Sequence, residues 1–354
     1  MTNTNTTDSQ ARTTTLDLMP KVDLHCHLIG TVRASTFAEL ARREGLDLPA
    51  EPERIFADIN SLPPDPDLYR DTRVPVPQGR SANEPEVSYS LFQASRWVTQ
   101  VLRDADDLTR ITYEAFEAAH RTSATRHLEV SFDAVPEHLA SLGYLGSVEA
   151  YAEGIRMAER DFGMSGRLIA AIDRSGSGED ALERVRTVVD HPHEYVAGIG
   201  LDNLETAGLG RTAHSSEHAP VAVNTITCLD VLGCDRIDHG YFVLQDDDVV
   251  ARVRDEQVPF TVISTTSRRS WRPWRRASIA AMLEAGLNVI PASDDPGMFP
   301  TTLAGEYRIL ADDLAVPDER LRRMALAGVE ASWLPPAEKA ALRTRFEKEL
   351  ADLA

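Results

Sequence analysis

The chain has 354 residues, of which 42% are hydrophobic and 26% charged, a composition typical of a globular protein with one or two domains. Its formal net charge of −19 argues against nucleic acids and anionic membranes as partners, since both bind to basic surfaces. Three cysteines are too few for a disulfide framework, and no run of eighteen apolar residues is present to cross a membrane, so we expect a cytoplasmic protein.

Residues 1–15 are rich in Thr, Asn and Ser and contain no apolar segment, which predicts a disordered tail and not a signal peptide. We expect residues 16–354 to form a single domain. In this part of the chain, short apolar runs rich in Val, Ile and Leu alternate with longer amphipathic segments. The predicted strands are 22–27, 127–132, 168–172, 196–201, 211–214, 236–240, 260–263 and 288–291, and the predicted helices are 35–44, 92–121, 147–161, 178–189, 220–232, 246–255 and 276–285.

Continuous apolar runs are typical of buried parallel strands, and the alternation of strands with helices predicts a parallel sheet. Eight such units predict an α/β fold, the (β/α)₈ or TIM barrel, in which functional side chains lie at the C-terminal ends of the strands. Two parts of the pattern are irregular. The interval 202–210 is too short for a full crossover helix, so the fourth βα unit is expected to be shortened. Residues 46–90, rich in Pro and Asp, predict an irregular excursion that forms a lid or pocket wall, and residues 304–354 predict C-terminal helices that pack on the barrel.

Four motifs lie at the C-terminal ends of predicted strands. They are His25-Cys26-His27, His214-Ser215-Ser216-Glu217, His239-Gly240 and Ser293-Asp294-Asp295-Pro296. Side chains alternate along a strand, so His25 and His27 are expected to point to the same face. Imidazole nitrogens and carboxylate oxygens suit Zn²⁺ or a similar divalent ion. Each motif alone has an ordinary interpretation, such as a turn for Ser-Asp-Asp-Pro, but their shared placement favours one mononuclear metal site.

These motifs resemble those of the adenosine/adenine deaminase family, and the similarity runs from about residue 19 to the C-terminal helices. The segments that carry it are Pro20-Lys-Val-Asp-Leu-His25-Cys-His27-Leu, His214-x-x-Glu217, Arg236-Ile-Asp-His239-Gly240 and Ser293-Asp294-Asp295-Pro296-Gly-Met-Phe299. The resemblance implies a (β/α)₈ barrel with one Zn²⁺ ion, with Fe²⁺ or Mn²⁺ as alternatives. Related barrels with two metals bridge them through a carboxylated lysine, and the absence of Lys between Lys21 and Lys339 excludes that arrangement.

The resemblance also implies roles for individual residues. By motif, the metal ligands would be His25, His27, His214 and Asp294. Glu217 would protonate the purine ring nitrogen next to the amino-bearing carbon. His239 would orient the attacking hydroxide, and Asp295 would hold the attacking water or the purine base.

The positions that would recognise the substrate depart from the family pattern. Ile29 stands where the family usually has an acidic residue that contacts the ribose or the base, and Asn203 stands where a glycine meets the purine. Ser215 and Ser216 replace an Ala-Gly pair, and residues 263–267 replace a Cys-Pro-x-Ser-Asn segment. Because the ligand and proton-transfer positions are kept while the recognition positions change, the resemblance implies the same chemistry on a different substrate.

A basic and aromatic cluster follows the seventh predicted strand. Its members are Arg268, Arg269, Arg272, Arg275 and Arg276, with Trp271 and Trp274. One interpretation is a solvated loop whose arginines pair with acidic neighbours. The other is recognition of an anionic substrate group, with Arg268 and Arg269 as contacts and the tryptophans stacked on a ring. Together with the apolar Ile29, the second interpretation predicts that plain adenosine is a poor substrate and that the preferred one carries a phosphate or carboxylate in place of a free 5′-hydroxyl.

We therefore predict a hydrolytic deaminase of a 6-aminopurine nucleoside, a base or a related amino-heterocycle. Two alternatives remain open: another mononuclear metal-dependent amidohydrolase, and a non-catalytic binder built on the same barrel. Ammonia release distinguishes the deaminase from another amidohydrolase. A purified protein without stoichiometric metal would favour the non-catalytic binder. The only partner we expect is a small aminopurine-like molecule, and the sequence carries no prediction of the oligomeric state.

Overall fold

A barrel of parallel strands forms the centre of the computed structural model, which describes residues 15–59, 89–133, 142–172, 178–200, 210–217, 220–266, 271–299 and 301–353. The strands are β1 (Lys21–His27), β2 (Thr125–Asp133), β3 (Ser165–Ala171), β4 (Val196–Gly200), β5 (Gly210–Ser215), β6 (Arg236–His239), β7 (Pro259–Val262) and β8 (Asn288–Pro291). They are hydrogen-bonded in sequence order, and a bridge between Cys26 and Asp294 brings the chain after β8 back to β1. All eight predicted strands are confirmed, and they form the expected, nearly closed α/β barrel.

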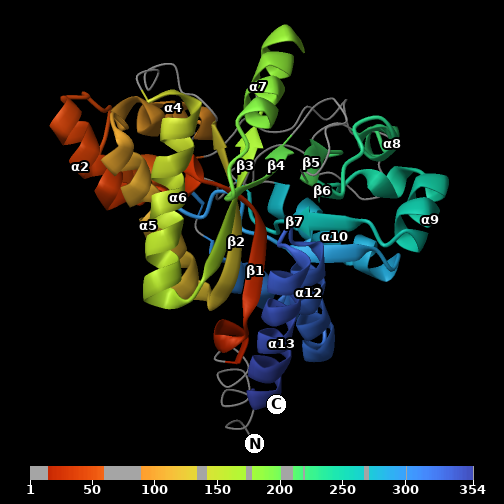
Figure 1. The fold of residues 1–354 in the computed structure, drawn as a ribbon. Coiled ribbons are helices and arrows are strands. Elements are labelled where there is room, and N and C mark those ends of the chain that lie inside the picture. Colours follow the sequence, from red (N-terminus) through yellow and green to blue (C-terminus); the bar gives the residue numbers. More distant parts are fainter. Residues whose placement is uncertain are drawn as a thin grey trace, which may run out of the picture.

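Helices cover the outside of the barrel (Figure 1). They are α2 (Ala34–Glu44), α3 (Pro52–Asp58), α4 (Leu91–Val101), α5 (Ala105–Ser123), α6 (Gly143–Phe162), α7 (Gly178–Asp190), α8 (Val223–Asp230), α9 (Asp247–Asp255), α10 (Arg272–Glu284), α11 (Leu303–Asp312), α12 (Asp318–Ala331) and α13 (Pro336–Asp352), with short 3-10 turns η1 (Ile29–Thr31) and η4 (Val243–Gln245). Figure 1 shows α2, α4, α5 and α6 on one side of the strands and α8, α9 and α10 on the other. The predicted C-terminal helices are confirmed as α11, α12 and α13.

Three helix predictions need correction. The single helix predicted for residues 92–121 is wrong, because Leu102 is extended and Asp104 starts a new helix by accepting a hydrogen bond from the Asp107 amide. The part of the predicted excursion at 46–59 is not wholly irregular, since it contains α3. Helix α10 begins at Arg272, before the predicted start at 276, because Pro273 is tolerated in a first helical turn.

Some predictions fall outside the described residues. These are the tail at 1–14, most of the proposed lid at 60–88, and the shortened fourth unit at 201–209. The strands on either side of the last segment, β4 and β5, pair directly and in parallel. The segment after the excursion begins at α4, whose first turn lines the pocket described below.

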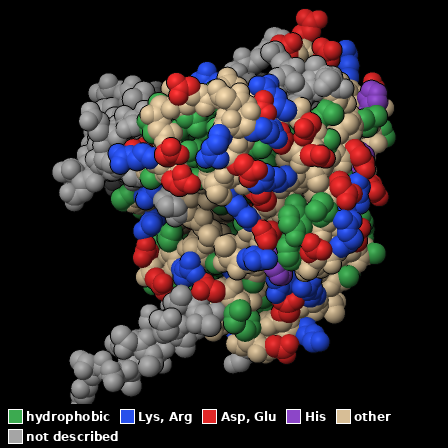
Figure 2. Space-filling view, turned by 90° about the vertical axis from the view of Figure 1, so that its left-hand side faces the viewer, with side chains coloured by type: hydrophobic (Ala, Val, Ile, Leu, Met, Phe, Trp, Pro, Cys, Tyr) green, Lys and Arg blue, Asp and Glu red, His purple; other side chains and the backbone are tan. Residues whose placement is uncertain are grey.

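Charged side chains of both signs are mixed on the surface. On the face drawn in Figure 2, Lys and Arg lie among Asp and Glu side chains and do not gather into one basic area. Ion pairs such as Arg110 with Glu39 account for part of this mixture. Among the helices described here, none combines the length and the apolar character that a membrane crossing would require.

Candidate active site

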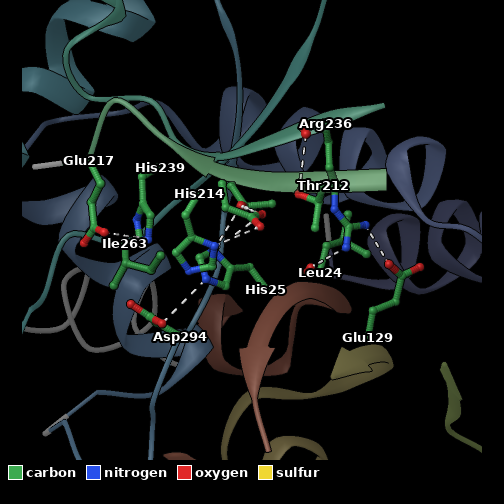
Figure 3. Close-up of polar contacts among 12 residues, drawn as sticks. Leu24, His25, Glu129, Thr212, His214, Glu217, Arg236, His239, Ile263 and Asp294 are labelled. Carbon is green, nitrogen blue, oxygen red and sulfur yellow. Dashed lines mark hydrogen bonds and ion pairs between the residues drawn. The ribbon is translucent and has the colours of Figure 1, made fainter. Parts of the chain in front are cut away.

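Three histidines and one aspartate converge at the C-terminal ends of the strands, and Figure 3 shows His25, His214 and Asp294 of this group. His25 and His27 lie on β1, His214 lies on β5, and Asp294 follows β8. One ligand atom from each lies within 4.8 Å of the others. The Nε2 atom of His27 is 3.3 Å from Nε2 of His25 and 3.3 Å from Nε2 of His214. Oδ1 of Asp294 is 3.5 Å from Nε2 of His25 and 3.3 Å from Nε2 of His27.

These distances fit the donor set of a single divalent ion. Ligand atoms about 2.0–2.1 Å from a zinc ion, at tetrahedral angles, lie roughly 3.3–3.4 Å from one another. Burial lowers the pKa of His25, and burial together with His25 lowers the pKa of His214 to about 3. Both imidazoles are therefore neutral, which is the form that binds a metal ion. The four residues can hold one divalent ion, as the sequence predicts.

A buried carboxylate behind the histidines fixes their orientation. Asp238 on β6 has one oxygen 3.5 Å from Nδ1 of His214, and it accepts a hydrogen bond of 2.7 Å from the hydroxyl of Thr261. The Thr261 oxygen lies 3.2 Å from Nδ1 of His25. The protons of both rings are thus drawn to Nδ1, which leaves the Nε2 lone pairs pointing to the common centre. Although burial raises it, the pKa of Asp238 lies well below its usual range because His25 and His214 favour the carboxylate.

Replacing Asp238 with Asn is expected to weaken metal binding by about 10–100-fold, as is typical for the loss of a carboxylate that supports a ligating histidine. The amide has one acceptor oxygen where the carboxylate has two, so either the contact with His214 or the hydrogen bond from Thr261 is lost. Competition with a fluorescent chelator measures the dissociation constant of Zn²⁺. The same change at exposed Asp248 on α9 is the control. An Asp238→Asn protein with the wild-type constant would show that the carboxylate does not orient the ligands.

Glu217 and His239 lie side by side next to the four-ligand cluster. Glu217 follows β5 and His239 ends β6, and Oε2 of Glu217 is 3.6 Å from Nε2 of His239. The ring of His239 is centred 4.8 Å from that of His25 and 4.9 Å from that of His214. Figure 3 shows Glu217 on the side of His239 that faces away from these ligands. Burial lowers the pKa of His239 well below its usual value, so the ring is neutral.

The adjacent carboxyl groups of Asp294 and Asp295 differ in protonation. Although burial raises it, the pKa of Asp294 lies well below its usual range because a hydrogen bond from His27 favours the carboxylate. Burial and the neighbouring Asp294 raise the pKa of Asp295 well above its usual value. Environments that separate the pKa values of two neighbouring carboxyl groups in this way are typical of acid–base sites. Asp294 is therefore suited to bind a cation, and Asp295 is suited to accept and keep a proton.

Three residues at the same strand ends have a strained backbone. Ser216, His239 and Asp294 have φ values of 49°, 73° and 61°, in the left-handed region that residues with a Cβ atom rarely adopt. Such conformations cost about 1–3 kcal/mol each and persist where the surrounding structure imposes them. The hydrogen bond from the Asp294 amide to the His25 carbonyl, 3.0 Å long, is one such constraint. Three residues of the motifs thus hold a strained backbone at the candidate site.

Replacing Gly30 with Ala is expected to lower turnover by about 10²-fold, because a misplacement of about 1 Å in a site can cost that much. A Cβ atom at Gly30 would lie 2.6 Å from Cγ and 2.7 Å from Cβ of Asp295, so the buried carboxyl group would have to move. Steady-state kinetics at full metal occupancy measure the change. Gly178→Ala is the control, because a Cβ atom there meets no atom within 4 Å among the described residues. Unchanged turnover in Gly30→Ala would show that the position of Asp295 does not matter.

One pocket is lined by three of the four candidate ligands and by their neighbours. It has a volume of about 490 Å³, within the usual range for small-molecule sites. The lining residues include His27, His214, Asp294, Asp295, Glu217, His239, Ile29, Gly30, Leu91, Phe92, Thr266 and Arg275. Ile29, predicted to contact the substrate, therefore lies at the pocket. Asn203, Arg268 and Arg269, predicted for the same purpose, lie outside the described residues.

The interpretation of Trp271 and Trp274 as stacking partners for a ligand is wrong. Both side chains are buried in the apolar core, where their rings pack edge to face with centroids 5.3 Å apart. Neither lines the pocket. Arg276 pairs with Asp313 on the surface, as the solvated-loop interpretation expects. Arg275 is the exception in this cluster, because its side chain is buried and pairs with Glu217.

Sequence reasoning missed the roles of Asp238 and Arg275. The alternation along β6 places Asp238 on the same face as Arg236, whose guanidinium forms a buried ion pair of 2.6 Å with Glu129 inside the barrel (Figure 3). That alternation could have indicated that the carboxylate of Asp238 points into the barrel. Arg275 lies 58 positions after Glu217 in the chain, so no local pattern connects the two.

A parallel barrel with three histidines and an aspartate at its strand ends defines an amidohydrolase-type fold with a candidate mononuclear metal centre. The family model described as adenosine deaminase matches residues 80–349. The chain belongs to the adenosine/adenine deaminase family, as the sequence motifs predict.

Individual relatives agree with this assignment. The chain is 30% identical to an adenine deaminase of Streptomyces coelicolor over 94% of this chain and 95% of the relative, and 26% identical to an adenosine deaminase of Shigella flexneri over 92% and 97%. Among solved structures, an amidohydrolase from Burkholderia ambifaria with bound Zn superimposes with a TM-score of 0.80 at 28% identity, covering 97% of this chain and 93% of that one. The adenine deaminase of Arthrobacter aurescens gives a TM-score of 0.76 at 27% identity, covering 94% and 99%.

Proposed function

We propose that the protein is a metal-dependent hydrolytic deaminase that converts the amino group of a 6-aminopurine, or of a related amino-heterocycle, to ammonia. The observation that carries the proposal is the position of Glu217, 3.6 Å from His239 and in one pocket with His27, His214 and Asp294. A hydrolase of amides or esters needs a nucleophile and a leaving-group acid, whereas a deaminase also needs a proton donor for the ring nitrogen. Relatives that carry the names adenine deaminase and adenosine deaminase support the same reaction.

The proposed reaction assigns one task to each group. His25, His27, His214 and Asp294 would hold a zinc ion, which would lower the pKa of water to about 7 and so make hydroxide available at neutral pH. The neutral ring of His239 orients the oxygen nucleophile toward the carbon that bears the amine. Asp295 holds the attacking water, and Glu217 gives a proton to the adjacent ring nitrogen as charge develops there. The amine then leaves as ammonia, so one water is consumed and one carbonyl oxygen is gained.

Contacts to the rest of the substrate are also proposals. An apolar Ile29 at the pocket offers no acceptor to a sugar hydroxyl, which disfavours plain adenosine by leaving that hydroxyl unpaired. We keep Asn203, Arg268 and Arg269 as proposed substrate contacts, with the two arginines suited to an anionic substituent.

An ammonia-release screen tests the proposed function. The panel contains adenine, adenosine, 5′-modified adenosines, AMP and other aminated heterocycles, each assayed with zinc-loaded protein and with protein treated with a chelator. Expected are ammonia release from at least one member and its loss after chelation. Acid release from amides or esters without any ammonia would instead identify a different amidohydrolase.

A further inference from the structure

Arg275 is a buried cation at the edge of the pocket, next to the proposed proton donor. It lies in the first part of α10, and only 1% of its surface is exposed. Its Nη2 atom donates a hydrogen bond of 2.6 Å to Oε1 of Glu217. The residue lines the same pocket as Glu217 and His239. A guanidinium group stays charged, so it places a fixed positive charge beside the reacting ring.

The donors of this guanidinium are not well satisfied. Among the described residues, the bond to Glu217 is the only short one that it makes. The Nη1 atom has contacts of 3.4 Å to the Tyr241 hydroxyl and to the Thr265 carbonyl, and Nε is buried without a hydrogen-bond partner in the part of the chain described here. Buried donors normally have an acceptor, because a buried donor without one costs free energy, and the cost is larger for a charged group. Among the residues that the structure describes, Nε of Arg275 therefore has no acceptor, and Nη1 has only long contacts.

The groups of the pocket follow one another in a fixed order. The histidine ligands come first, His239 lies next to them, Glu217 lies next to His239, and Arg275 lies on the other oxygen of Glu217. Within the proposed function, the carbon that bears the amine faces the ligands and His239, and the adjacent ring nitrogen faces Glu217. The next ring atom after that nitrogen then faces Arg275.

We infer that the preferred substrate carries an oxo group on the ring carbon that follows this nitrogen, and that Arg275 is a specificity-determining residue that donates to the oxo oxygen. This inference rests on the proposed function and specifies its substrate class: amino-heterocycles with the sequence amino-carbon, ring nitrogen, carbonyl carbon. The oxo group supplies a short-range acceptor to a guanidinium whose Nε has none among the described residues and whose Nη1 has only contacts of 3.4 Å. The reaction stays balanced, since the C–NH₂ group and water give a C=O group and ammonia, while the second carbonyl is unchanged.

Paired substrates that differ only in this oxo group test the inference on the wild-type protein. The pairs are adenine with 2-oxoadenine, and 4-aminopyrimidine with cytosine, assayed by ammonia release. We expect kcat/KM to be at least about 10²-fold higher for the oxo member of the preferred pair, because a site built for a hydrogen bond strongly rejects an analogue that lacks the partner. Equal or better turnover of the members without the oxo group would overturn the inference and leave the proposed function intact. No ammonia from these compounds or from the wider panel would overturn both.

Arg275→Met separates contact with the substrate from support of Glu217. If Arg275 contacts the oxo group, the variant loses at least about 10²-fold more kcat/KM on the oxo member than on its partner, so the preference disappears. An equal loss on both members would show that Arg275 acts only through Glu217 and would overturn the inference. Arg254→Met, at an exposed arginine that pairs with Asp255 on α9, is the control and keeps the preference. If Arg275→Met does not fold, the paired substrates on the wild-type protein still decide the question.

Discussion

Replacing Glu217 with Gln is expected to lower turnover by about 10²–10⁴-fold while the metal stays bound, because general acid–base catalysis typically contributes that much. The amide has the same shape as the carboxyl group, and its oxygen can still accept the hydrogen bond from Arg275 that now measures 2.6 Å. It cannot give a proton to the ring nitrogen. The loss should therefore appear in kcat with little change in metal content or in the melting temperature.

The matched control is Glu319→Gln, at a carboxyl group that lies on the surface of α12. Turnover and metal content are measured in the same samples of both variants and of the wild type. Near-normal turnover of Glu217→Gln would mean that Glu217 is structural, and the proposed proton transfer would be wrong.

Replacing Asp294 with Asn is expected to remove the bound ion and, with it, about 10³-fold or more of the activity, since the ion contributes several kcal/mol to the reaction. Asn is chosen because it tolerates the left-handed backbone, with φ of 61°, better than other residues with a Cβ atom. The neutral amide lacks the charge that completes the donor set of three histidines and one carboxylate. Metal content by elemental analysis and ammonia release are the two readouts.

Asp295→Asn is the comparison for this experiment, because it changes the neighbouring carboxyl group without removing a proposed ligand. We expect Asp295→Asn to keep its ion and lose turnover, whereas Asp294→Asn loses both. An Asp294→Asn protein that retains one tightly bound ion would contradict the assignment of Asp294 as a ligand.

The barrel could be predicted because its strands are buried on both faces and read as short apolar runs. The helix boundaries were harder, since they depend on single residues. The break between α4 and α5 is made by an extended Leu102 and the capping side chain of Asp104, and the amphipathic pattern continues across both.

The candidate ligands could also be predicted, because H-x-H on a strand and motifs at strand ends follow from periodicity and from the barrel itself. Their convergence is confirmed. The hydrogen bond from Thr261 to Asp238 and the ion pair of Arg275 with Glu217 could not be predicted from the sequence, since each joins elements that are distant in the chain. Burial of Trp271 in the core depends on how α10 packs, which the local sequence does not specify. The catalytic roles of Glu217, His239 and Asp295 stay predictions until the variants are measured.

The most direct test of a mononuclear deaminase is a titration of metal-free protein with Zn²⁺, with ammonia release from the best substrate of the panel measured at each step. The account predicts that activity rises in proportion to bound zinc and reaches its maximum at one ion per chain, held by His25, His27, His214 and Asp294. Full activity in the metal-free protein, or a maximum reached only at two ions per chain, would contradict it.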